Sequence, residues 1–465
     1  MRSTGAALLL VALCALVTAG PAAAQPDPFA GAPGLGDPYY PLDGNGGYDA
    51  AHYDVRIGYD PPSRVLDGTT TIDATATQPL RAFHLDYTGP PVRMVTVNGL
   101  PAAFRSQDEQ ELVITPLLPL LPGLPFRVIV DYGGPMPDTG GEGWTFAPSG
   151  GAFAAGEPHS ARTWYPLNDT PLDKATFTLR ATVPAEWQVM GNGVRTRDEV
   201  IAGQRHVDWE NRHPTIGYLT TVAVDRFEFL EQTAADGTPI LSGFAPGAVR
   251  HRELEQRLPE ILGFSADLFG PYPFEAAGGI YLDTELPFSL ETQTRPTYAE
   301  WVDLNTVVHE IAHQWWGDSV SIRSWADICL NECFASYTAD YLWPERVDGA
   351  DVDAEYRDTV RRFRDVPRFW QIPLGNPGAG AEFTSVYYRG PLFLHALRRT
   401  VGDEVFFAAL RDFQAEYAGG NAAMADWRSF VQRRTPVPLD GFFDAWLGGE
   451  TPPPDEYLFP GSLRG

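Results

Sequence analysis

Four side chains between positions 309 and 332 carry the clearest chemistry in this sequence. His309 and His313 are four residues apart, so on a helix their imidazoles project from one face and can share one tetrahedral ion. Glu332, in Leu330-Asn331-Glu332, supplies a third ligand from further along the chain. Two ring nitrogens and one carboxylate predict a single zinc ion per chain, with a fourth position open to water.

Glu310 follows the first histidine directly, too close to complete the same coordination shell but well placed to take a proton from a zinc-bound water. The activated water then attacks a carbonyl, and Glu310 returns the proton to the leaving amine. The alternative, a solvated helix face with two incidental histidines, is a poor explanation in a chain with only 9 histidines. The set therefore predicts a zinc hydrolase, with a peptidase as the first candidate.

Composition describes a globular and strongly acidic protein. Of its 465 residues, 44% are hydrophobic and 12% aromatic, which is enough for about two domains with buried cores. The formal net charge is -26, and Lys174 is the only lysine. A negative net charge argues against nucleic acid and anionic membrane surfaces as partners. Peptides are the substrates expected of the predicted peptidase.

The first 24 residues have the features of an export signal. Arg2 precedes an apolar run over 6–17, and small residues lead to a cleavage site that we expect after Ala24. The run is too short for a stable membrane span, and no later segment is long and apolar enough. Cys14 leaves a lipid anchor as the minor alternative. We expect a secreted protein, or a periplasmic one if the source has an outer membrane.

Two further cysteines flank the third predicted ligand. Cys329 and Cys333 lie four apart on either side of Glu332. In an exported protein such a pair suggests a disulfide, although closure within one helical turn would be strained, and two buried thiols are an equal alternative. A separate zinc site on these sulfurs would compete with the histidine set.

Composition and the periodicity of apolar residues divide the chain into five segments. After the signal (1–24), residues 25–47 are rich in Pro, Gly and Asp and read as a linker or extended arm. Short alternating runs broken by turns, such as 92–97 and 175–183, predict a β-rich domain over 48–230. Helical patterns then dominate 231–450, at 253–268, 304–316, 325–342 and 390–400. Residues 451–465 read as an irregular tail.

These motifs carry a family resemblance. His-Glu-Ile-Ala-His-Gln-Trp-Trp-Gly at 309–317, with Leu330-Asn331-Glu332, resembles the gluzincin zinc aminopeptidases typified by aminopeptidase N and leukotriene hydrolase. Residues 161–166, 173–177 and 270–274 look like further landmarks of that family. The resemblance implies an α+β fold of two domains, a saddle-like antiparallel β domain on a thermolysin-like, mainly helical catalytic domain. It also implies that the large carboxy-terminal helical domain of many relatives is not encoded here, which would leave a more open cleft.

The resemblance also implies three further site residues. Tyr387, in Tyr-Tyr-Arg-Gly, resembles the tyrosine that stabilises the oxyanion in these enzymes, although Arg389 replaces the usual lysine. Glu291 resembles the glutamate of the family's amine-binding strand, and Glu157 matches a position whose side chain touches the same amine. Phe288 and Thr292 depart from the usual glycine and asparagine of that strand, so the first side-chain pocket is expected to differ. Asp340 is a candidate support for a zinc histidine.

Three functions are consistent with this pattern. A zinc aminopeptidase uses both the catalytic set and the two amine-binding glutamates. A zinc endopeptidase or other zinc hydrolase shares the metal chemistry without needing Glu291. A non-catalytic zinc-binding protein would give Glu310 and Tyr387 no purpose. We favour the aminopeptidase, and cleavage of amino-blocked peptides discriminates it from the second class.

Overall fold

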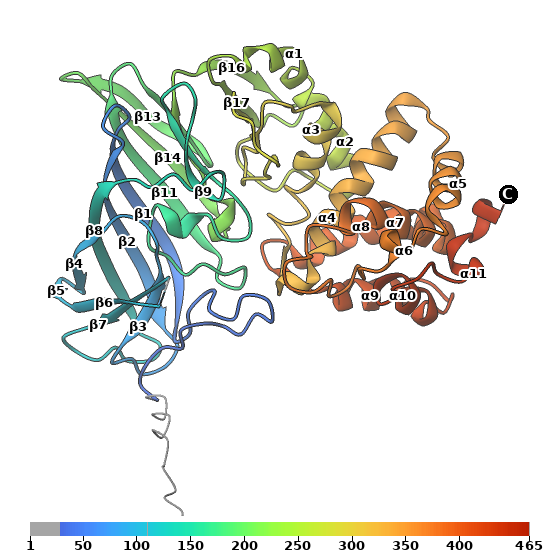
Figure 1. Ribbon diagram of the computed structural model, residues 1–465, viewed down its shortest axis with the longest axis horizontal. Coiled ribbons are helices and arrows are strands. Elements are labelled where there is room, and N and C mark those ends of the chain that lie inside the picture. The colour runs from blue at the N-terminus through green and yellow to red at the C-terminus, as the bar shows by residue number, and fades with distance from the viewer. Residues whose placement is uncertain (1–27, 109, 465) are drawn as a thin grey trace, which may run out of the picture.

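The structure is a computed structural model that describes residues 28–108 and 110–464, so the predicted signal segment and Cys14 lie outside the described residues. A β-rich body formed by the amino-terminal half stands beside a mainly helical body that ends near the carboxyl terminus (Figure 1). This confirms the predicted α+β architecture of two domains. In the described part of the chain, no helix has the length and apolar character needed to cross a membrane.

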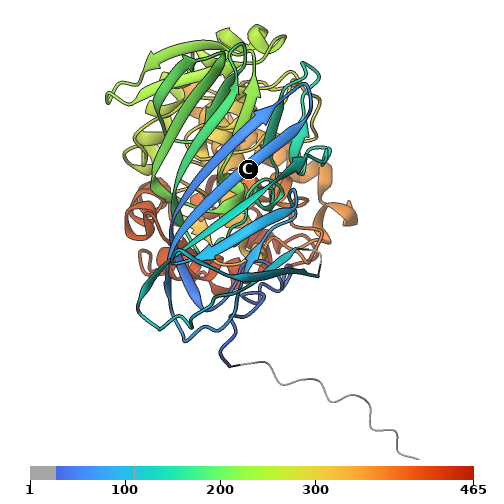
Figure 2. The same ribbon diagram turned by 90° about the vertical axis from the view of Figure 1, so that its left-hand side faces the viewer.

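An eight-stranded sheet forms the frame of the first domain, in the order β13-β14-β11-β1-β2-β8-β4-β5. β1 (Tyr48–Asp60) pairs in parallel with β11 (Ala175–Pro184) and antiparallel with β2 (Val65–Ala76). Every second residue from Tyr53 to Tyr59 is buried, as expected for a strand with one face on the core. Figure 2 shows this sheet nearly face on, with the helical domain behind it.

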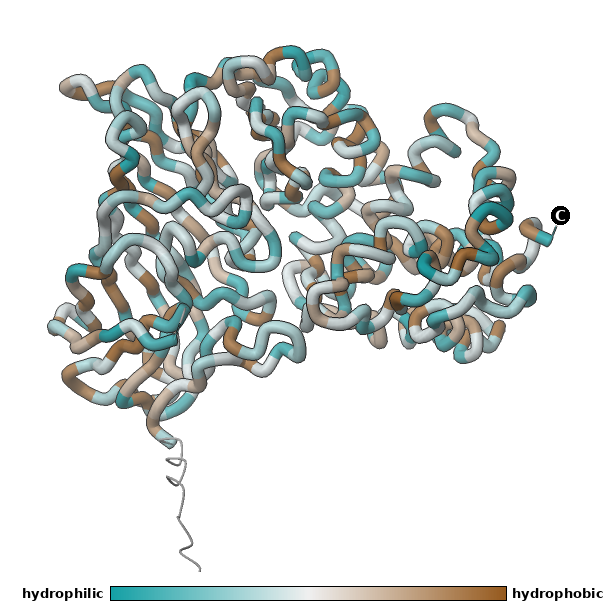
Figure 3. The backbone as a smooth tube through the Cα atoms, in the orientation of Figure 1, coloured by the Kyte–Doolittle hydropathy of each residue, from teal (hydrophilic) through white to brown (hydrophobic). Residues whose placement is uncertain are grey.

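The first domain also contains two smaller sheets, whose strand orders are β12-β15-β10-β9 and β3-β7-β6. Hydrophobic and hydrophilic residues alternate along many of these strands (Figure 3), which is the period-two pattern of the sequence. The remaining strands of this domain are β3 (Phe83–Asp86), β4 (Val92–Val97), β5 (Leu100–Pro101), β6 (Ala103–Gln107), β7 (Glu111–Thr115), β8 (Pro125–Pro135), β9 (Gly143–Phe146), β10 (Ala152–Ala155), β12 (Gln188–Gly191), β13 (Val194–Ile201), β14 (Gln204–Thr215) and β15 (Val222–Asp225).

The second domain begins with a small sheet and continues as packed helices. Its sheet has the order β16-β17-β18-β19, and β20 pairs with β21. Its strands are β16 (Glu228–Thr233), β17 (Pro239–Phe244), β18 (Ile280–Tyr281), β19 (Thr297–Tyr298), β20 (Ser321–Ile322) and β21 (Asn421–Ala422). Its α-helices are α1 (Arg252–Glu255), α2 (Leu258–Phe269), α3 (Leu304–Ala312), α4 (Cys329–Tyr337), α5 (Val352–Phe363), α6 (Pro367–Trp370), α7 (Val386–Val401), α8 (Asp403–Tyr417), α9 (Met424–Gln432), α10 (Asp440–Leu447) and α11 (Asp455–Leu458).

The described part of the predicted linker, residues 28–47, is an arm that contacts the helical domain. The Asp37 carboxylate accepts a hydrogen bond from the Trp325 amide (2.9 Å), and the Tyr40 hydroxyl donates to the buried Glu382 carboxylate (2.8 Å). We call residues 28–47 the N-terminal arm. The same arm also bonds the first domain, since Arg162 donates to the Asp43 carboxylate (2.9 Å), so the arm ties the two domains together.

The predicted irregular tail differs from the structure. Residues 451–465 include α11, and both Leu458 and Leu463 are fully buried. The Tyr356 hydroxyl on α5 donates to the Leu458 carbonyl (2.6 Å), which fixes the tail to the helical domain. Two leucines in a Pro-rich segment are too few to show a periodic face, so this packing left no pattern in the sequence.

Cys329 and Cys333 form a disulfide across one turn of α4, with Cα atoms 4.7 Å apart. That separation lies within the ordinary range for disulfides. Both sulfurs are buried, and Cys333 faces Gly390 of α7. The covalent link therefore lies in the contact between α4 and α7, the helices that carry Glu332 and Tyr387.

Candidate active site

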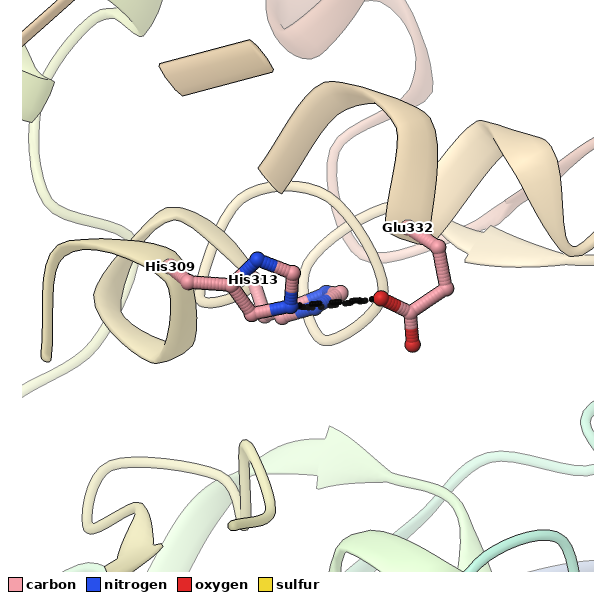
Figure 4. Close-up of side chains that lie close together, drawn as sticks. All are labelled: His309, His313 and Glu332. Carbon is pink, nitrogen blue, oxygen red and sulfur yellow. Dashed lines mark hydrogen bonds and ion pairs between the residues drawn. The ribbon is translucent and has the colours of Figure 1, made fainter. Parts of the chain in front are cut away.

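The three predicted ligands converge where α3 approaches α4. α3 begins after Asp303, whose carboxylate accepts the Thr306 amide as an N-cap, and its last turn holds His309. His313 follows directly after the helix. Glu332 Oε2 lies 3.2 Å from His309 Nε2 and 3.4 Å from His313 Nε2, and the two ring nitrogens are 3.0 Å apart. All three side chains point toward one another (Figure 4), and their atoms are a donor set that zinc prefers.

Hydrogen bonding orients His313 toward the shared point. Its Nδ1 donates to the Trp316 carbonyl oxygen (2.8 Å), which fixes the ring so that Nε2 faces Glu332. Burial raises the pKa of Glu332, but the charge of His313 and hydrogen bonds from both imidazoles outweigh it and hold this pKa well below its usual range. The carboxylate is therefore ionised and fit to bind a cation.

His309 has a weaker support. Its Nδ1 lies 3.5 Å from the Ser336 hydroxyl oxygen, one turn beyond Glu332 on α4. Asp340, the sequence candidate for this support, instead accepts a hydrogen bond from the Asn305 side-chain amide (2.9 Å). It lies in the π-helical stretch Thr338–Leu342 that continues α4.

Glu310 is buried on the cavity side of α3. Burial raises its pKa well above the usual range, and the charges of Glu291 and Glu332 raise it further against an opposing effect of His313. A carboxylate oxygen of Glu310, one of Glu291 and a ring nitrogen of His313 lie within 4.8 Å of one another. The predicted base thus borders both the ligand cluster and a predicted amine-binding residue.

Both predicted amine-binding glutamates line the same cavity of about 700 Å³ as the ligand cluster. Glu291 Oε1 accepts a hydrogen bond from the Tyr218 hydroxyl (2.8 Å), whereas Glu157 Oε1 is buried without a hydrogen-bond partner. Burial, followed by the charges of Glu291 and Glu332, raises the pKa of Glu157 well above its usual range. A buried, unpaired carboxylate is costly, so this arrangement favours a cationic ligand.

Tyr387 lies in the first turn of α7 and lines the cavity, with its ring centroid 6.1 Å from that of His309. Its neighbour Tyr388 is 68% exposed and lines the rim of the same cavity. Arg389 is fully buried, and its guanidinium donates to the carbonyls of Trp370 (2.7 Å) and Trp446 (3.2 Å). The arginine at this position therefore anchors the helix that positions Tyr387.

Gln314 is a positioning residue that the sequence analysis missed. Its side-chain carbonyl accepts the Thr294 amide (2.7 Å), and its amide donates to the Glu291 carbonyl (3.1 Å). It therefore holds the Glu291 segment against the end of α3. Its place directly after His313 was the only signal. Phe288 lines the cavity as the unusual residue of that segment, whereas Thr292 is buried and bonds backbone and side-chain oxygens of its own loop.

Lys174 fixes the first domain to the loop that follows α3. Its ammonium donates to the carbonyls of Asp318 and Ser319, each at 3.0 Å. Burial lowers the pKa of Lys174 to about 7, while the charge of Asp318 opposes this shift. The only lysine of the chain thus supports the domain seam beside the ligand cluster.

A β-rich domain packed on a helical domain, with two histidines and a glutamate closing on one point at the seam, defines a zinc metallopeptidase. Comparison with known proteins names the family. Residues 49–219 match the peptidase M1 N-terminal domain, and residues 279–446 match the peptidase family M1 domain. The chain belongs to peptidase family M1, and this membership implies a catalytic zinc ion.

Solved relatives share the whole two-domain arrangement. The M1 zinc metallopeptidase from Deinococcus radiodurans is 30% identical, with a TM-score of 0.82, over 90% of this chain and 98% of that chain. A mutant of that enzyme bound to the substrate Tyr-Ser-Ala superposes with a TM-score of 0.81 at 30% identity, over 90% of this chain and 99% of that one.

Curated relatives are longer. Human endoplasmic reticulum aminopeptidase 1 is 24% identical over 84% of this chain and 46% of its own length. Pig glutamyl aminopeptidase is 24% identical over 62% of this chain and 34% of its own length. The chain thus spans less than half the length of these relatives.

Proposed function

We propose that this protein is a zinc aminopeptidase that releases amino-terminal residues from peptides. The observation that carries the proposal is the position of Glu291, which is buried, and of Glu157, whose Oε1 is buried, in the cavity that also holds the ligand cluster. An ammonium group between them would neutralise charge that burial makes costly. The names of the curated relatives, which are aminopeptidases, support the same activity.

His309, His313 and Glu332 would hold the metal, since their three donor atoms face one point. Zinc held there supplies a Lewis acid that acidifies water and polarises a carbonyl. Glu310 takes the proton of the attacking water and passes it to the leaving amine. Tyr387 donates its hydroxyl hydrogen bond to the oxyanion as negative charge develops.

Paired peptides test the aminopeptidase activity. We expect the zinc-loaded protein to cleave a free peptide such as Leu-Ala-Ala-Ala and to leave its amino-acetylated form intact, because acetylation removes the charge that the two glutamates bind. Equal cleavage of both peptides would replace the proposal with an endopeptidase. No cleavage across a broad panel of peptides would favour a non-catalytic zinc protein.

Charge-removing variants locate the amine site. Glu157→Gln and Glu291→Gln should each lower kcat/KM for free peptides by roughly 10- to 100-fold, the range for a hydrogen bond to a charged group. Glu285→Gln is the matched control, because Glu285 is exposed on the same segment as Glu291 and does not line the cavity. A loss in the control as large as in the other two would assign the effect to general electrostatics.

We also propose that the protein is exported, to the cell exterior or to the periplasm. The signal-like composition of residues 1–24 supports this proposal, and so does a disulfide at Cys329 and Cys333, because such bonds persist in oxidising compartments. Mass spectrometry of the protein from culture medium and from periplasm should find a new amino terminus at Gln25. A cytosolic protein that keeps Met1 would contradict the proposal.

A further inference from the structure

A second cavity adjoins the one that holds the ligand cluster. It has a volume of about 520 Å³ and lies between the π-helical stretch after α4, helices α5 and α6, and the start of α7. Asn305, Tyr387 and Tyr388 line both cavities. The two spaces therefore meet at the residue proposed to stabilise the oxyanion.

The positions of the two amine-binding glutamates determine in which direction a peptide lies across the two cavities. Glu157 and Glu291 line only the first cavity, so a peptide amine bound there places the scissile carbonyl near the ligand cluster and Tyr387. The second cavity meets the first at Asn305, Tyr387 and Tyr388, so it is placed to receive a residue that follows the scissile bond.

Its polar lining is acidic and not neutralised by the protein. Asp340 and Glu355 both line it, no lysine or arginine does, and neither carboxylate forms an ion pair with a described residue. Burial raises the pKa of Glu355, and the negative charge of Asp340 raises it further, so the two carboxylates repel each other. Asp340 is half-buried and Glu355 is exposed at the edge of the cavity, and two like charges on one wall favour a cationic ligand.

The hydroxyl of a largely buried tyrosine, Tyr341, independently points to a ligand in this cavity. Tyr341 is 5% exposed and lines the cavity, yet its hydroxyl has no hydrogen-bond partner among the described residues. Burial and then the charge of Glu355 raise its pKa well above the usual range, so the group is a neutral hydroxyl. The hydroxyl of a tyrosine with a largely buried ring normally finds a partner, and a ligand with N–H donors would supply one here.

The apolar walls suit a flat cation on an aliphatic stem. Phe363 and Phe369 line the cavity with stacked rings, 4.6 Å between centroids and 7° between planes. Exposed Tyr388 adds a third ring at the junction of the cavities. Aromatic faces attract guanidinium and ammonium groups, and the volume is sufficient for one long side chain.

We propose that the second cavity binds an arginine or lysine side chain of a residue that follows the scissile bond, so that the enzyme prefers peptides with a basic residue near the new amino terminus. Asp340 and Glu355 pair with the cation, and the Tyr341 hydroxyl accepts one of its hydrogen bonds. This inference rests on the proposed aminopeptidase activity, because that activity sets the direction of the peptide.

A citrulline comparison isolates the charge. Citrulline has nearly the shape of arginine but no charge, so we compare Leu-Xaa-Ala-Ala and Leu-Ala-Xaa-Ala with arginine or citrulline at Xaa. In one of the two series we expect kcat/KM to be at least about tenfold higher for arginine, the effect of one charge-assisted hydrogen bond. Equal values in both series would overturn the inference and leave the aminopeptidase proposal intact.

Variants assign the preference to this cavity. Glu355→Gln should reduce the arginine-to-citrulline ratio at least threefold, and the double variant with Asp340→Asn should bring it close to one. Asp358→Asn is the matched control, because Asp358 is exposed on the same helix, α5, and pairs with Arg361 outside the cavity. If the arginine-to-citrulline ratio of kcat/KM stayed at the wild-type value in the double variant, another site would bind the charged side chain and the inference would be refuted.

A binding measurement keeps the test independent of turnover. Isothermal titration of the zinc-loaded Glu310→Gln variant with the same peptides should show tighter binding of the arginine form, and addition of Glu355→Gln should remove the difference. If the wild-type protein cleaves none of these peptides while this charge preference in binding persists, the activity proposal fails and the cavity assignment stands. If binding shows no preference, the cavity assignment fails.

Discussion

Gly390→Ala tests how closely α7 must approach α4 for the site to work. A Cβ atom at position 390 would lie 2.6 Å from the Cys333 sulfur, 2.7 Å from its Cβ and 2.8 Å from its Cα. An ordinary contact between carbon atoms is about 3.6 Å, so the helices would have to separate by roughly 1 Å. Cys333 cannot turn away freely, because its sulfur is bonded to Cys329.

Two magnitudes follow from this clash. Overpacking of this kind costs about 1–3 kcal/mol of unfolding free energy, which in a protein of 465 residues lowers Tm by roughly 1 to 3 °C. Because Tyr387 lies about one turn before Gly390 on α7, a shift of about 1 Å would also misplace its hydroxyl and lower kcat by about 100-fold.

Differential scanning calorimetry and steady-state kinetics on a free peptide measure the two effects. Gly263→Ala is the matched control, because Gly263 lies in helix α2 and a Cβ there meets no atom within 4 Å. The control should gain about 0.5–1 kcal/mol from the better helix propensity of alanine and keep its kcat. If Gly390→Ala also kept the wild-type Tm and kcat, the contact between α4 and α7 would not position the site, and the reasoning would be wrong.

Three further predictions concern single side chains. Tyr387→Phe should lower kcat by about 10²- to 10³-fold with little change in KM, and unchanged kinetics would remove it from the mechanism. Glu310→Gln should keep its zinc, measured by atomic emission, and lose nearly all turnover; metal loss would mean that it is a ligand. Burial raises the pKa of Glu255 to about 7 from an ordinary 4.5. The stability that this group contributes is therefore full below about pH 4.5 and is lost as the pH rises through about 7. The total loss is about 3 kcal/mol of unfolding free energy. Urea unfolding of Glu255→Gln should show a smaller fall in unfolding free energy between about pH 4.5 and 8 than urea unfolding of the wild type.

Local periodicity explains why much of the fold and of the ligand cluster could be predicted. Residues four apart on a helix share a face wherever that helix packs, so His309 and His313 needed no tertiary information. The alternating runs at 92–97 and 175–183 likewise correspond to β4 and β11. Tyr387, Glu291 and Glu157 required the family resemblance, because nothing near them in sequence marks their role.

Features that depend on distant partners could not be predicted. Asp340 was predicted to support a zinc histidine, but it lies in the π-helical stretch after Tyr337 and its carboxylate accepts a hydrogen bond from Asn305. The second cavity needs Tyr341 and Glu355 to meet across two helices, and neither residue is unusual in sequence. The arm residue Tyr40 likewise lies in a Pro- and Gly-rich stretch without periodicity.

The N-terminal arm imposes an order on biosynthesis. Asp37 and Tyr40 bond residues 288 and 342 positions further along the chain. The ribosome makes these partners only in the last third of translation. Until then, the side chains of Asp37 and Tyr40 can form hydrogen bonds only with water. Such distant pairings form slowly, because a long loop has to close first. Until they form, a nascent molecule presents residues 37–40 to proteases, and a cut there would distinguish unfinished copies from mature ones.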